Sequence, residues 1–246
     1  MPTLTKAQEA WSVLTSAADE ARAVAQAAAE RIAEIRGDDT RSDSWKQAAI
    51  QRIKDETAAA IAARRQAVAD ARATLLAAAR ELSRPPSGDP AAQLLAETRQ
   101  QRAWARILPQ LTAGRPLRDI LAEAVDAKDV AAVTALAAEA PAWVQANHQG
   151  ASGLDRLADG RPNLDGLRQA LDVAIVRVLG DDNGLGSAAR YRLHVAAHYP
   201  LSMAKLAQAA AGGRGDLESV LATTYAQQAA DAITAQLDGQ AATPSA

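Results

Sequence analysis

The feature that most constrains this chain is an apolar seam that repeats over its first 82 residues in steps of three and four. That spacing is typical of the heptads of a coiled-coil helix. The seam occurs twice, before and after a polar turn at residues 37–44. Its first copy comprises Leu4, Ala7, Trp11, Leu14, Ala18, Ala21, Ala25, Ala28, Ile32 and Ile35, and its second Ile50, Ile53, Thr57, Ile61, Arg64, Val68, Ala71, Leu75, Ala78 and Leu82. Because the turn is short, the sequence predicts an antiparallel helical hairpin.

The ends of both predicted helices carry capping signals. Thr5 with Gln8 has the form of a capping box, and Gly37 stands where a helix end favours glycine. Ser44 with Gln47 repeats the capping box at the start of the second helix. These signals place the hairpin at residues 5–83.

Alanine fills most central seam positions, so the two helices can approach closely but bury little apolar surface. Each missing methylene group costs about 0.8 kcal/mol of burial. We therefore expect the hairpin to dock on another helix, and we favour one from another chain over the rest of this chain. The large residues of the first arm, Trp11 and Leu14, should lie near Leu75 and Leu82. The predicted interface residues are Trp11, Leu14, Ile32, Ile35, Ile50, Ile53, Ile61, Val68, Leu75 and Leu82.

The clearest break in the chain follows the hairpin, at Arg84-Pro-Pro-Ser-Gly-Asp-Pro90. The paired prolines cannot continue a helix, whereas Asp89 and Pro90 suit a helix start. The predicted domains are a hairpin at 1–84, a linker at 85–90, a compact helical domain at 91–238 and a flexible tail at 239–246. Within the second domain we expect a central helix at 164–179 and a surface loop at 150–163. Pro141 and Pro200 are each expected to separate two short helices.

Composition supports an all-α fold and limits the chemistry. Alanine, the best helix former, supplies 64 of the 246 residues, while Phe and Cys are absent. The absence of cysteine excludes disulfides and thiolate catalysis. A net charge of −2 favours neither nucleic acid nor an anionic membrane as a partner. Without a signal-peptide pattern or a long apolar run, we expect a cytoplasmic or virion location and no membrane partner.

Three patterns in the sequence are candidate functional sites. His194 and His198 share one helix face at a spacing that metal sites use, but a third ligand would have to come from His148 or a distant carboxylate. Gly184, Gly186 and Ala189 spell the glycine pattern of a dinucleotide turn without the strand that such a turn needs. A basic cluster could grip phosphate groups. Its members are Arg99, Arg102, Arg106, Arg115 and Arg118.

These observations predict a non-enzymatic structural or assembly protein that acts through helix–helix contacts in a homo-oligomer or larger assembly, without a cofactor. In composition, an alanine-rich hairpin joined to a motif-free helical unit resembles the small helical structural components of bacteriophage particles from GC-rich hosts. The resemblance implies a virion or assembly component, or a bacterial scaffold-like protein. One alternative is a nucleic-acid-associated regulator that uses the basic face at residues 99–118. Another is a metal-dependent enzyme that uses His194 and His198.

Overall fold

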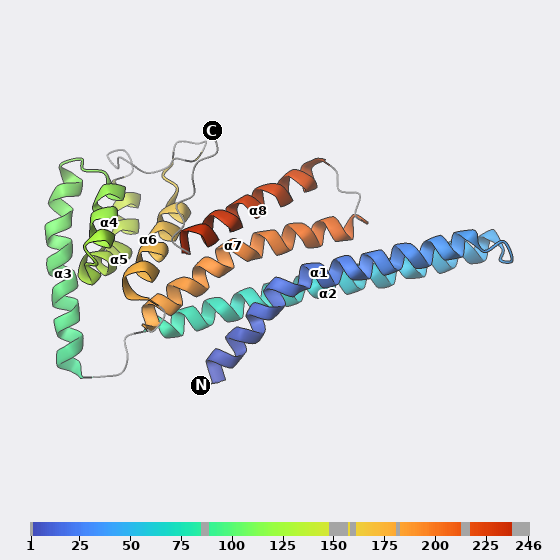
Figure 1. The fold of residues 1–246 in the computed structure, drawn as a ribbon, viewed down its shortest axis with the longest axis horizontal. Helices are drawn as coiled ribbons and strands as arrows, with labels where there is room; N and C mark the ends of the chain where they lie inside the picture. Colours follow the sequence, from blue (N-terminus) through green and yellow to red (C-terminus); the bar gives the residue numbers. More distant parts are fainter. Residues whose placement is uncertain are drawn as a thin grey trace. The chain divides into compact units, whose positions relative to one another are not determined.

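The computed structural model describes residues 2–84, 89–147, 157, 161–180, 183–212 and 217–237. Within these ranges the chain forms eight α-helices and no β-strand, which confirms the predicted all-α class (Figure 1). The helices are α1 (Pro2–Gly37), α2 (Asp43–Leu82), α3 (Pro90–Thr112), α4 (Leu117–Asp126), α5 (Val130–Ala146), α6 (Leu164–Leu179), α7 (Gly184–Ala210) and α8 (Leu217–Leu237). None of the helices in the described ranges combines the length and apolar character needed to cross a bilayer.

The two long helices α1 and α2 form the predicted antiparallel hairpin and run side by side in Figure 1. Arg64, the charged member of the second seam, donates through Nε to Glu20 Oε2 across the hairpin at 3.1 Å. Thr57, the other polar seam member, donates through Oγ1 to the Ile53 carbonyl oxygen at 2.7 Å. Both polar side chains of the seam therefore have hydrogen-bond partners.

The turn between α1 and α2 is closed by its own side chains. Asp38 accepts hydrogen bonds from the backbone N–H and the hydroxyl of Thr40. These bonds, led by that of the Thr40 hydroxyl, lower the pKa of Asp38. The helix α2 begins at Asp43, one residue before the predicted Ser44, and the Ser42 hydroxyl accepts from the Trp45 N–H at 3.4 Å.

The chain divides into two compact units, and the division differs from the predicted one. Residues 1–78 and 194–246 form unit 1, and residues 79–193 form unit 2. Helix α8 and the part of α7 from His194 onward therefore group with the hairpin, while the first turns of α7 group with the helices that follow Pro90. Of the predicted linker at 85–90, residues 85–88 lie outside the described residues, and so does the predicted tail at 239–246. Asp89 does cap α3 as predicted, because its side chain accepts from the Ala91 N–H at 2.9 Å.

Unit 2 is organised around α5, which packs on α3, α4 and α6. The side chains of Val133, Leu136 and Val144 on this helix are fully buried. The helix predicted as central, residues 164–179, is found as α6, with every residue from 171 to 176 buried. The predicted loop at 150–163 lies outside the described residues except for Leu157 and residues 161–163.

The prediction that Pro141 and Pro200 each separate two helices is wrong. Pro141 lies inside α5 and Pro200 inside α7. An internal proline removes one helix hydrogen bond and costs about 3 kcal/mol. Buried residues beyond each proline offset that cost, because both helices continue into a core. They are Val144 on α5, and Leu201, Ser202 and Leu206 on α7.

Candidate functional site

The burial of the seam differs along the hairpin of unit 1, which has two parts. The base comprises residues 5–21 of α1 and 61–78 of α2, and the tip comprises residues 22–60. At the base, the Ser202 hydroxyl of α7 donates to the carbonyl oxygen of Leu14 at 2.7 Å in a buried position. The Arg72 guanidinium of α2 lies 4.8 Å from the ring centroid of Tyr199. The base therefore docks on the chain's own helix α7.

This finding bears on the preference for a partner helix from another chain. At the base, the helix that docks on the hairpin is α7 of the same chain. The reason is that the part of α7 from His194 onward groups with the hairpin in unit 1. For the tip, docking on another chain stays a prediction.

The seam at the tip is less well covered than the seam at the base. Ile32, Ile35 and Ile50 are only half-buried, whereas Leu14, Val68 and Leu75 at the base are fully buried. Trp45 is 45% exposed and stacks only on the Arg41 guanidinium, 4.9 Å from its ring centroid. Two helices alone cannot enclose their shared seam, so the tip carries apolar surface that a further helix could bury.

The predicted interface residues divide into two groups. The buried ones are Leu14, Ile53, Ile61, Val68 and Leu75, and the half-buried ones are Trp11, Ile32, Ile35, Ile50 and Leu82. A buried side chain holds the hairpin together and has no surface left for a partner. A partner at the tip would instead touch the half-buried isoleucines and the exposed residues beside them, which the seam pattern does not identify.

His194 and His198 lie together on α7, where both rings pack on Trp11 of α1. The Trp11 ring centroid is 4.4 Å from that of His194 and 4.8 Å from that of His198. Burial, with a smaller contribution from the charge of Lys205, lowers the pKa of His198. No group of three possible metal ligands occurs in the described part of the chain, and His148 lies outside it. The geometry is that of a ring cluster joining α7 to α1.

The predicted basic cluster on α3 and α4 is partly neutralised by carboxylates of unit 2. Arg106 lies 3.6 Å from Asp129, and Arg115 pairs with Glu123 and Gln110. Such exposed pairs contribute about 0–1 kcal/mol each but reduce the local positive charge. Arg118 lies 3.4 Å from Asp119. Arg99 and Arg102 form no ion pair with any residue that the structure describes, so two of the five arginines in the cluster are unpaired there.

The glycine pattern at 184–189 has a packing explanation. A Cβ at position 186 would overlap the carbonyl oxygen of Gly180, and one at position 184 would lie 2.9 Å from that of Leu82. Gly180 itself ends α6 with φ of +67°, a conformation that favours glycine. The glycines thus let α7 start against the ends of α6 and α2, and no strand precedes them in the described residues.

A buried ion pair in unit 2 was missed by the sequence patterns. Arg192 Nε donates to both carboxylate oxygens of Asp172, at 3.0 and 2.9 Å, and its Nη1 donates to the Ser83 hydroxyl at 3.3 Å. Burial raises the pKa of Asp172 and outweighs the opposing effect of Arg192. The one available signal was an aspartate within the apolar face of α6, since a buried charge requires a partner.

Comparisons with known proteins add no further assignment. The sequence matches no protein-family model, and no curated protein or solved structure is detectably similar to it. The geometry of the chain itself is therefore what bears on its function.

Proposed function

We propose that this protein is a non-enzymatic structural or assembly protein that associates through the tip of its α1–α2 hairpin, with a second copy of the same chain as the partner. A bacteriophage virion or assembly component, or a bacterial scaffold-like protein, would fit this description. The observation that carries the proposal is the incompletely buried seam of the tip, at Ile32, Ile35 and Ile50.

The shape of the tip suits packing against a further pair of helices. Its outer positions are rich in alanine, and Ala29, Ala33, Ala58 and Ala59 are all exposed. Small side chains allow helix axes to approach closely, at separations near the lower end of the usual ~8–10 Å. Two tips side by side would form a four-helix bundle in which each half-buried isoleucine gains cover.

Charge favours a second copy over a strongly charged partner. Residues 22–60 contain seven basic side chains, at positions 22, 31, 36, 41, 46, 52 and 54, and seven acidic ones, at positions 30, 34, 38, 39, 43, 55 and 56. Two such surfaces carry no net repulsion, and their mixed charges can pair across an antiparallel contact. A nucleic acid would find no excess of positive charge here.

The alternatives have less support from the geometry. The nucleic-acid hypothesis relied on Arg99, Arg102, Arg106 and Arg115, of which the last two already pair with carboxylates. The metal-dependent enzyme relied on His194 and His198, whose rings pack on Trp11. Neither has an observation in its favour comparable to the exposed seam.

The test is sedimentation of the full-length protein over a range of concentrations, together with thermal melting. We expect a dimer or larger species, with a melting temperature that rises with concentration. Ala29→Glu combined with Ala59→Glu should shift the protein toward monomer, because it places charge on the exposed face of the tip. Ala92→Glu, at an exposed position on α3, is the matched control and should leave association unchanged. A protein that stays monomeric with a concentration-independent melting temperature would refute the proposal.

A further inference from the structure

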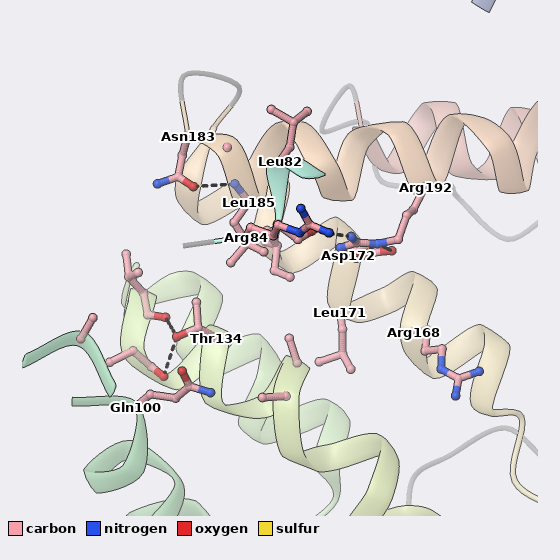
Figure 2. A pocket seen from close by; sticks show the side chains of 18 of the residues that line it. Leu82, Arg84, Gln100, Thr134, Arg168, Leu171, Asp172, Asn183, Leu185 and Arg192 are labelled. Carbon is pink, nitrogen blue, oxygen red and sulfur yellow. Dashed lines mark hydrogen bonds and ion pairs between the residues drawn. The ribbon is translucent and has the colours of Figure 1, made fainter. Parts of the chain in front are cut away.

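Unit 2 contains a cavity of about 930 Å³, which is separate from the hairpin tip (Figure 2). Its walls come from α3, α5 and α6, together with the C-terminal end of α2 and the first turns of α7. All of these residues lie between positions 79 and 193, within one compact unit. The volume falls in the range of ~300–1,000 Å³ that is typical of sites for small molecules.

Most of the cavity surface is apolar. Side chains from five helices contribute to it, so the apolar lining comes from elements that are distant in sequence. The larger members are Leu82, Val130, Leu171, Ile175 and Leu185. On α5, Ala131, Ala137 and Ala138 line the wall between them and keep the space open, because none of them fills it.

The charged groups at the cavity are unbalanced. Four arginines line it, Arg84, Arg99, Arg168 and Arg192, against the single carboxylate of Asp172. Asp172 is already held by Arg192 (Figure 2). Arg168 lies 3.2 Å from the exposed Asp165. Arg84 and Arg99 form no ion pair with any residue in the described ranges. Two guanidinium groups thus remain for a ligand.

We propose that this cavity binds a small amphiphile, a molecule with an apolar body and one anionic head. The apolar walls would cover the body, and Arg84 and Arg99 would bind the head. A guanidinium group pairs with a carboxylate or a phosphate through two parallel hydrogen bonds, so either head matches the site. A neutral apolar molecule leaves the arginines unmatched, and a small inorganic anion leaves the apolar wall in water.

The binding test uses calorimetric titration of the full-length protein with decanoate, decyl phosphate and decanol. We expect at least one of the two anions to bind about tenfold more tightly than decanol, since charge-assisted hydrogen bonds contribute about 1.5–3 kcal/mol. The ratio between the two anions distinguishes a carboxylate head from a phosphate head. Equal binding of all three probes, or no binding stronger than about 1 mM, would overturn the proposal.

Variants locate the site. Arg84→Gln combined with Arg99→Gln should weaken anion binding about tenfold or more and leave decanol binding unchanged. Arg102→Gln, on α3 but outside the cavity, is the matched control and should have no effect. Ala138→Trp should abolish binding by filling the cavity from an exposed wall position, where the fold tolerates a larger side chain. Undiminished binding in both cavity variants would also overturn the proposal.

Discussion

The base and the tip of the hairpin are built from one repeating pattern but differ in burial. At the base, seam residues as small as Ala7 and Ala21 are fully buried, because α7 packs on the two hairpin helices. At the tip, Ile32, Ile35 and Ile50 in equivalent seam positions are only half-buried, although Ile53 is buried. An apolar seam thus predicts which face of a helix turns inward. How deeply that face is buried depends on a third helix, which the seam does not predict.

The largest effect is expected when one seam side chain in each part is shortened to alanine. Leu14→Ala at the base should lower the free energy of unfolding by about 2–5 kcal/mol, because Leu14 is fully buried. Ile32→Ala at the tip should cost about 1–2 kcal/mol, because its side chain is already half in water. Denaturant unfolding at low protein concentration measures both. Equal costs would break the distinction between base and tip.

The same pair of variants can sharpen the proposed association. If two tips pack together, the cost of Ile32→Ala should grow with protein concentration, whereas the cost of Leu14→Ala should not. Self-association stabilises the folded state by mass action, so the melting temperature of an associating protein rises with its concentration. If the loss of stability in Ile32→Ala does not depend on protein concentration, the tip does not bind a second copy.

A smaller effect is expected where α7 joins the base. Ser202→Ala removes the buried hydrogen bond to the Leu14 carbonyl oxygen and should cost about 1 kcal/mol. Ser12→Ala, at an exposed position of α1, is the matched control and should stay within about 0.5 kcal/mol of the wild type. Thermal and denaturant unfolding check both values. A Ser202→Ala variant as stable as the control would mean that the hydroxyl does not hold α7 on the hairpin.

The smallest expected effect is a pH dependence that His198 gives to the base, in the range where a histidine titrates. Burial lowers the pKa of His198 below its ordinary value of 6.5, with Lys205 acting in the same direction and Trp11 and His194 facing the ring. The unfolded chain therefore takes up the proton more readily than the fold. Stability that is present above pH 6.5 should fall as the pH drops through the lowered pKa.

Unfolding of the wild type and of His198→Gln, measured between neutral and mildly acidic pH, checks this expectation. The wild type should lose more stability on acidification than the variant does. Parallel pH profiles of the two proteins would show that His198 is not a source of the dependence.

Much of the fold followed from local patterns. The seam predicted the hairpin, the apolar spacing predicted α6 with its observed bounds, and Asp89 with Pro90 predicted the start of α3. The prediction that Pro141 and Pro200 end helices was wrong. The rule that proline ends a helix is local, whereas the burial that keeps these helices continuous comes from contacts with other helices. Residues beyond each proline are buried in a core, and that burial sustains the helix through the proline.

The candidate sites were less predictable, because their groups meet only in space. Asp172 and Arg192 are 20 residues apart, and Ser202 reaches Leu14 across 188 residues. The arginine cluster was recognised in sequence, but the carboxylates that pair with Arg106 and Arg115 come from later elements. The glycines of 184–186 gave a nucleotide-like pattern whose actual cause is contact with the ends of α6 and α2.

By itself, the sequence determined the helices and their inward faces, because helix propensity, capping and heptad spacing act between residues within a few positions of one another. Only the tertiary structure decided that α7 covers the base and leaves the tip half-exposed. It also decided that α3, α5 and α6, with the end of α2 and the start of α7, line a cavity with two arginines that form no ion pair in the described residues. Burial and charge pairing arise between residues far apart in the chain, so they become definite only when the helices pack.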